Sequence, residues 1–189
     1  MTNDETFSGR LLIGSTGSAA VAMLPVYLSA LRSQFTGTVT VLMTHTATRF
    51  LPAHTAALFA DQVVTGEPES TWARHNQVTL AAEHDMLAVL PATANMLAAT
   101  ATGAAGNLLS ATVLAASFPV VFFPVMSGEM WGKPAVKRNV EAVRTDGYHV
   151  VDPAWGPRYD VALGTFVNSP MPPPPPRFIE VVREFMPQA

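Results

Sequence analysis

The stretch MLAVLPATANM, residues 86–96, joins a continuous apolar run to a proline, small residues and an asparagine. The run predicts a strand buried on both faces, which ends at Pro91. Residues 92–94 leave room for a flat ligand beside the backbone, and Asn95 carries a hydrogen-bond donor and an acceptor. No charged residue occurs over 86–128, so we expect this segment in the core or in a subunit contact.

The pattern continues on both sides of this stretch, with apolar runs alternating with segments of helical spacing. Strands are expected at 10–14, 38–45, 86–90, 120–125 and 148–153, and helices at 17–34, 49–60, 95–101, 107–116 and 134–147. The alternation predicts a Rossmann-like α/β fold, a three-layer, doubly wound parallel sheet in a single domain. Ligands of such sheets lie beyond the carboxyl ends of the strands.

Charged residues form 13% of the 189-residue chain, against about 25% in an average soluble protein. Such a deficit indicates that part of the surface is hidden from water, either in a membrane or in an oligomer. Pro119 and Pro124 interrupt the apolar segment 108–126, which argues against a membrane span. The start, MTNDETFSGR, is acidic and polar where a signal peptide would be basic and then apolar. We therefore expect a cytoplasmic protein.

The composition excludes several kinds of site. The chain has no cysteine, so it has no disulfide, thiolate nucleophile or thiolate metal site, and we expect no metal. The net charge of −3 argues against nucleic-acid binding. Small molecules and peptides remain as ligands.

The two ends of the chain are expected to differ from the central domain. We expect a flexible N-terminus over 1–9, a proline segment over 171–176 and a C-terminal helix over 177–186. The five prolines at 172–176 predict an extended polyproline stretch. It is either a stiff strap leading to the last helix or a docking ligand for an aromatic groove.

Two more loops follow predicted strands. Gly14 and Gly17 in GSTGSAAV permit a tight turn into a helix N-terminus, which indicates either a phosphate site or an ordinary glycine-rich turn. Thr44, Thr46 and Thr48 offer hydroxyls after the second strand, and the alternative is helix capping. Three such loops at one sheet edge suggest a cofactor with a phosphate and a ring.

These loops resemble the homo-oligomeric flavin-containing cysteine decarboxylases. The matching motifs are GSTGSAA, the T-x-x-A-x-x-F pattern of Thr44, Ala47 and Phe50, PATANM in place of a P-A-S-A-N-T signature, and PVMSGEMWGKP in place of P-x-M-N-x-x-M-W. The resemblance covers nearly the whole chain in order. It implies bound FMN and trimers that can assemble into dodecamers.

The resemblance also assigns residues. Those implied to hold FMN are Gly14, Ser15, Thr16, Gly17, Ser18, Thr44, Thr46, Phe50, Ala92, Thr93, Ala94, Asn95, Met96 and Val125. Those implied to hold the substrate are Met126 and Ser127. The family usually has asparagine at Ser127, so the substrate carboxylate is either held differently here or bound by backbone amides.

The catalytic histidine of the family lies fourteen residues before the proline of the third motif, and that count from Pro91 gives Gln77. If this chain has a short insertion between His75 and Pro91, His75 takes the position of the catalytic histidine, and we take it as the catalytic residue. The alternatives are that Gln77 occupies the catalytic position, or that His75 is a solvated loop histidine. His84 is expected to be a surface helix residue.

The absent cysteine sets the expected reaction. Phosphopantothenoylcysteine decarboxylases carry a cysteine in a late loop that helps to reduce the enethiol, whereas this chain has Leu163 at the matching place. The resemblance thus implies FMN-dependent oxidative decarboxylation of the C-terminal cysteine of a ribosomal precursor peptide, giving an enethiol for an aminovinyl-cysteine ring. The alternatives are a phosphopantothenoylcysteine decarboxylase of coenzyme A biosynthesis and a non-catalytic flavin-binding regulator.

Overall fold

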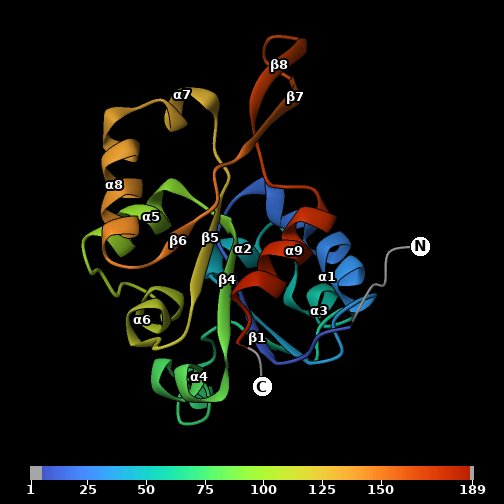
Figure 1. Cartoon of the computed structure of the whole chain (residues 1–189), viewed down its shortest axis with the longest axis vertical. Coiled ribbons are helices and arrows are strands. Elements are labelled where there is room, and N and C mark those ends of the chain that lie inside the picture. Colours follow the sequence, from blue (N-terminus) through green and yellow to red (C-terminus); the bar gives the residue numbers. More distant parts are fainter. Residues whose placement is uncertain (1–5, 188–189) are drawn as a thin grey trace.

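A computed structural model describes residues 6–187, and its centre is a six-stranded parallel sheet (Figure 1). The spatial order is β3-β2-β1-β4-β5-β6. The strands are β1 (Arg10–Ser15), β2 (Thr38–Met43), β3 (Gln62–Val64), β4 (Met86–Ala92), β5 (Val120–Pro124) and β6 (His149–Val150). β1 and β4 pair directly, with Leu12 opposite Leu87. The chain therefore reverses its direction of winding between β1 and β4.

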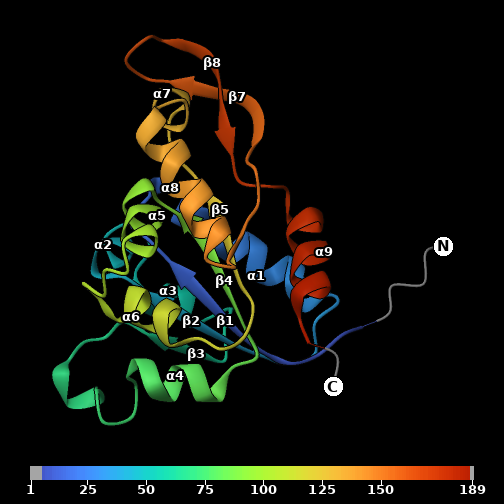
Figure 2. The same cartoon turned by 60° about the vertical axis from the view of Figure 1, so that its left-hand side comes forward.

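Helices cover both faces of the sheet (Figures 1 and 2). One face carries α1 (Leu24–Arg32), α3 (Ala53–Ala56) and α9 (Pro175–Phe185), and the other carries α4 (Gln77–Glu83), α5 (Ala94–Ala101), α6 (Leu108–Ala115) and α8 (Pro134–Thr145). Leu11 and Ile13 belong to the first core and Leu12 to the second, because successive strand residues point to opposite faces. The predicted doubly wound α/β fold is confirmed.

The ends of several elements differ from the expectation. The first helix begins as a 3-10 turn, η1 (Ala19–Met23), and becomes α-helical one residue before Pro25, which favours a first-turn position. The helix expected over 49–60 is reduced to α3, which follows Pro52. Two further short elements are η2 (Glu69–Thr71) and α2 (His45–Thr48).

The strand expected at 148–153 is not the last strand of the chain. It shortens to β6, and an antiparallel hairpin of β7 (Ala154–Asp160) and β8 (Thr165–Met171) follows. The hairpin projects from the body of the molecule beside α7 (Gly128–Trp131) (Figures 1 and 2). Leu163 lies in the turn at its tip and is 68% exposed.

The proline segment and the last helix lie over the first face of the sheet. The Tyr27 hydroxyl donates a 2.6 Å hydrogen bond to the carbonyl of Pro173. The extended part ends at Pro174, and α9 starts at Pro175, because proline is tolerated in the first turn of a helix. Phe178 of α9 packs against Phe123 with ring centroids 5.1 Å apart.

Part of the N-terminal segment expected to be flexible, residues 1–5, lies outside the described residues. Within the rest of it, Phe7 forms a bridge with Phe35, and the two ring centroids are 5.0 Å apart. In the part of the chain that the structure describes, no helix is long and apolar enough to cross a bilayer.

Candidate functional site

The loops after β1 and β4 are joined by hydrogen bonds at the point where the winding reverses. The buried Thr16 hydroxyl donates to the carbonyl of Pro91 at 2.7 Å and accepts from the backbone N–H of Thr93 at 3.0 Å. Ser15, also buried, donates its hydroxyl to the carbonyl of Leu90 at 2.8 Å. Doubly wound sheets bind ligands at such a reversal. These hydrogen bonds therefore hold the loops of the expected ligand site together.

Hydroxyl side chains cap the helices that follow three of the strands. Thr44 accepts from the N–H of Ala47 at 3.3 Å, Thr93 from Met96 at 3.4 Å, and Ser127 from Met130 at 3.3 Å. The capping interpretation of Thr44 is therefore confirmed. An accepting hydroxyl still has its own hydrogen to donate, so capping leaves these groups able to bind a ligand.

These helix starts surround a cavity of about 420 Å³. Its walls include Thr16, Gly17, Thr44, Thr46, Thr93, Ala94, Asn95 and Met96, all of them predicted, together with Asn107 and Met130. Ligand pockets for small molecules have volumes of about 300–1,000 Å³. The three loops thus converge on one site of cofactor size.

The other residues expected to hold cofactor or substrate lie behind or beside this cavity. Gly14, Ser15 and Ala92 are buried in strands, and Phe50 is half exposed. Ser18 caps η1, and Val125 donates its N–H to the carbonyl of Ala92 at 2.9 Å. Met126 packs against the second core, and Ser127 caps α7. Their assigned contacts stay predictions.

Gly14 in β1 and Gly17 in the loop after it both lie close to neighbouring side chains. A Cβ at Gly14 would lie 2.5 Å from Cδ1 of Leu109, so Gly14 lets β1 pack on α6. A Cβ at Gly17 would overlap the side chain of Thr46. Gly17 therefore lets the first loop reach the second, and its bare backbone lies on the cavity wall.

His75 lies on the wall of a second cavity of about 390 Å³, which shares Thr44 and Asn107 with the first. Gln77 lies on the same wall. The Nε2 atoms of Gln62 and His75 are 3.3 Å apart. A glutamine amide can donate to a bare ring nitrogen or, turned over, accept from a protonated one. Gln62 can therefore hold the His75 ring in either protonation state.

Asn107 and Met130 were not predicted as cavity residues. Asn107 caps α6 and accepts from the N–H of Ser110 at 3.0 Å. Its position directly after Gly106 and before an apolar run is the N-cap signal that could have indicated it. Met130 of α7 is 46% exposed at the cavity rim.

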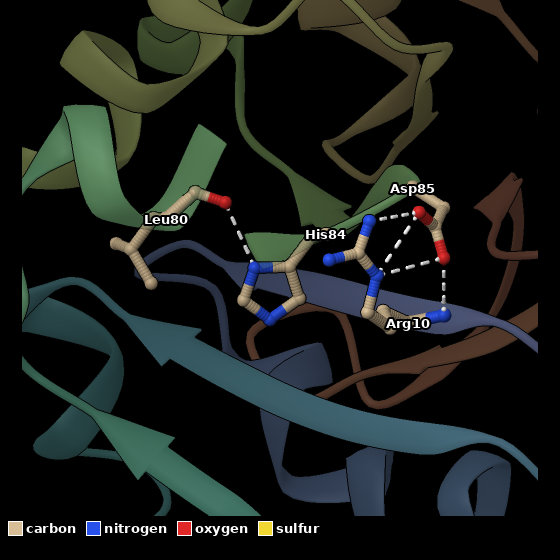
Figure 3. Close-up of polar contacts among 4 residues, drawn as sticks. All are labelled: Arg10, Leu80, His84 and Asp85. Atoms are coloured by element: carbon tan, nitrogen blue, oxygen red, sulfur yellow. Dashed lines mark hydrogen bonds and ion pairs between the residues drawn. The ribbon is translucent and has the colours of Figure 1, made fainter. Parts of the chain in front are cut away.

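The expectation for His84 was wrong, because its side chain is buried and only 7% exposed. Its Nδ1 lies 2.8 Å from the carbonyl oxygen of Leu80, and beside it the guanidinium of Arg10 faces Asp85 (Figure 3). Burial lowers the pKa of His84, and the hydrogen bonds from Arg10 lower the pKa of Asp85. Arg10 starts β1, so this cluster lies at the sheet edge opposite the cavities.

A model of the flavoprotein family matches residues 2–168. This chain belongs to the flavoprotein family. It is 40% identical to mersacidin decarboxylase of Bacillus sp. (strain HIL-Y85/54728) over 82% of the chain and 79% of that protein. It is 33% identical to the coenzyme A biosynthesis bifunctional protein CoaBC of Mycobacterium bovis, over 82% of the chain but 37% of that protein.

Solved structures agree with these relatives. A variant of the peptidyl-cysteine decarboxylase EpiD with one histidine replaced by asparagine, complexed with the substrate peptide DSYTC, superposes with a TM-score of 0.82 at 26% identity, over 96% of this chain and 99% of EpiD. The FMN-dependent cysteine decarboxylase SpaF superposes with a TM-score of 0.70 at 35% identity, over 83% and 88%. The resemblance to flavin-containing cysteine decarboxylases is confirmed.

Proposed function

We propose that this chain is an FMN-dependent decarboxylase that oxidises the C-terminal cysteine of a ribosomal precursor peptide to an enethiol. The observation that carries the proposal is the pair of adjoining cavities at the carboxyl edge of the sheet, one walled by the flavin motifs and the other by His75. Relatives named for this chemistry span most of the chain.

The first cavity fits FMN. Gly17 offers bare backbone, Thr44 and Thr46 offer hydroxyls, and Asn95 offers an amide on the same wall. Hydroxyls and backbone N–H groups at helix starts suit a phosphate, and Ala94 leaves space for a ring. FMN, when bound, accepts the two electrons that the substrate loses.

His75 would handle the proton of the substrate thiol. As the peptide cysteine loses two hydrogens it becomes a thioaldehyde, and loss of carbon dioxide from this compound leaves the enethiol. An imidazole can accept the thiol proton near neutral pH and return it. The Gln62 amide, 3.3 Å away, would orient the ring through both states.

The absence of cysteine from the sequence favours an oxidised product over the reduced thiol. Leu163 at the tip of the β7–β8 hairpin has no exchangeable hydrogen with which to assist a reduction. The relation to CoaBC keeps phosphopantothenoylcysteine as the second candidate substrate. A flavin-binding regulator without turnover is the third candidate.

We further propose that the chain works as a trimer or a dodecamer in the cytoplasm, where ribosomal peptides are made. Large apolar side chains remain exposed on the single chain, among them Met23 at 51%, Val26 at 49% and Met130 at 46%. Contacts between copies would remove such surface from water.

Incubation of the flavin-loaded protein with a peptide that ends in cysteine separates the three candidates. Mass spectrometry should record the loss of one carbon dioxide and two hydrogens. Turnover of phosphopantothenoylcysteine alone, with loss of carbon dioxide only, would establish the second candidate. No mass change with either substrate would establish the third.

A further inference from the structure

The two ring nitrogens of His75 have different surroundings. Nε2 lies 3.3 Å from Nε2 of Gln62, whereas no residue that the structure describes forms a hydrogen bond with Nδ1. His75 lies on the wall of the second cavity, and Gln62 lies outside that wall. The engaged nitrogen therefore faces the protein, and Nδ1 is the nitrogen left for a ligand in the cavity.

Both partners of this contact have a fixed backbone. Gln62 begins the edge strand β3, and the carboxylate of Asp61 directly before it accepts from the N–H of Val39 at 2.7 Å. The N–H of His75 donates to the carbonyl of Thr71 at 2.8 Å. Neither backbone can shift without breaking these bonds, so the amide and the ring meet in one defined position.

The amide determines which tautomer of the neutral ring is favoured. A nitrogen that takes the thiol proton must be bare, so the other nitrogen of the neutral ring carries the hydrogen. With Nδ1 bare, Nε2–H donates to the Gln62 carbonyl oxygen, for which the amide is turned over. Once Nδ1 has taken the proton the same bond persists, and the charged ring is the stronger donor. The amide therefore favours a ring that reacts at Nδ1.

A neutral amide, and not a carboxylate, holds this ring. Glu67 lies on the same cavity wall, but its carboxylate faces His45 at 3.6 Å. A carboxylate at Nε2 would stabilise the protonated ring and make it a weaker acid, whereas an amide carries no charge. Gln62 thus orients the ring and still lets it return the proton.

We propose that Nδ1 of His75 exchanges the substrate thiol proton, and that Gln62 is the positioning residue that keeps a hydrogen on Nε2. This inference rests on the proposed function and deepens it. In the step, the S–H bond of the substrate breaks, an N–H bond forms at Nδ1, and the sulfur keeps the electron pair. Gln62 itself touches no reacting atom.

Iodoacetamide tests this assignment without turnover. The sequence has no cysteine, so thiols do not consume the reagent. At slightly alkaline pH, where imidazoles are neutral, a bare ring nitrogen displaces iodide and forms a C–N bond. The Nδ1 and Nε2 products are separated by chromatography after digestion. In the flavin-loaded parent His75 should react mainly at Nδ1, while the exposed His54 should give both products.

Three variants complete the design. Gln62→Met keeps the side-chain length but removes the amide, so His75 should react mainly at Nε2, the less hindered nitrogen. Its flavin should also bleach on the order of tenfold more slowly with a cysteine-ending peptide, and a serine-ending peptide should bind as to the parent. Gln62→Glu restores an acceptor for Nε2–H and should restore the Nδ1 product. Gln34→Met removes an amide that contacts Arg183 instead, and it should behave like the parent.

The inference is overturned if His75 of the parent reacts mainly at Nε2 or does not react, or if Gln62→Met still gives the Nδ1 product. Failure of the proposed function is distinguishable, because it leaves cysteine-ending peptides unchanged in mass whatever the alkylation product. Conversely, decarboxylation by a parent protein that gives the Nε2 product would refute only the roles of Nδ1 and Gln62.

Discussion

The hydroxyl of Thr16 donates a 2.7 Å hydrogen bond to the carbonyl of Pro91, and this contact joins the first and third ligand loops at the reversal of the sheet. The same oxygen accepts from the N–H of Thr93 at 3.0 Å. One side chain thus fixes the backbone from which the cavity wall at Thr93 to Met96 is built.

Thr16→Val should therefore weaken both the fold and the flavin site. Valine keeps the shape but removes the acceptor of the partly buried Thr93 N–H and the donor to the Pro91 carbonyl, which costs about 1–3 kcal/mol. We expect the free energy of unfolding in urea to fall by that amount and the FMN content after purification to fall with it. Thr16→Ser keeps the hydroxyl and should retain both. Unchanged FMN content in Thr16→Val would show that the contact does not shape the cavity.

Gly17→Ala should lower FMN affinity. The added methyl group would meet the side chain of Thr46, so the first two loops must move apart. The comparison is Gly106→Ala, where an added Cβ meets nothing within 4 Å. Titration of the flavin-free proteins with FMN should show weaker binding for Gly17→Ala alone. Equal affinities would place the phosphate away from this loop.

Asn95→Asp should weaken FMN retention, because an amide that can donate a hydrogen bond on the cavity wall is exchanged for a negatively charged carboxylate that cannot. Absorbance of the purified protein near the flavin maximum measures the retained FMN. Asn168→Asp makes the same change on an exposed position of β8 and should retain FMN like the parent. If both variants keep the parent's flavin content, Asn95 has no contact with the cofactor.

His84 predicts a pH dependence of stability that is separate from catalysis. Burial lowers its pKa below the ordinary value of 6.5, so the unfolded chain binds a proton more readily than the folded one. Stability is then full above about pH 6.5 and falls as the pH drops toward the folded-state pKa. The pKa of Asp85 is lowered from 3.8, so its contribution is lost only in more acidic solution.

The measurement for His84 is the urea midpoint between pH 7.5 and pH 5. His84→Gln cannot titrate and should flatten the curve in this range, with flavin binding retained. A parent curve that is already flat, or an equal slope in His84→Gln, would mean that His84 is not the titrating group.

Much of the fold could be predicted because the segment 86–90 and the other expected strands are short, apolar runs that alternate with segments of helical spacing. The β3 strand was missed since three residues, Gln62–Val64, give no periodic signal. The β7–β8 hairpin was missed since Gly156, Pro157 and Pro170 interrupt its strands and indicate a loop. Its strands pair from Asp160 with Thr165 at the tip to Ala154 with Met171 at the base.

The site was predictable where a residue's role follows from its position directly after a strand. Thr93 and Asn95 could be found in this way, and both lie on the cavity wall. Thr16 was assigned to the cofactor, but its link to Pro91 could not be foreseen because it depends on the pairing of β1 with β4. The prediction for His84 was wrong because the charged neighbours Glu83 and Asp85 suggest a solvated segment. In the structure the His84 ring is buried and forms a hydrogen bond with the carbonyl oxygen of Leu80.

The role of His75 is the central claim, and anaerobic single-turnover bleaching of the flavin tests it most directly. A peptide ending in cysteine should bleach the flavin of the parent protein. His75→Asn should keep FMN and assembly yet bleach about a hundredfold or more slowly, because it removes a general acid or base. Gln77→Ala should be milder, since an amide cannot act as a general acid or base near neutral pH. Parent-like bleaching in His75→Asn together with a stalled Gln77→Ala would contradict the account and place the active site around Gln77.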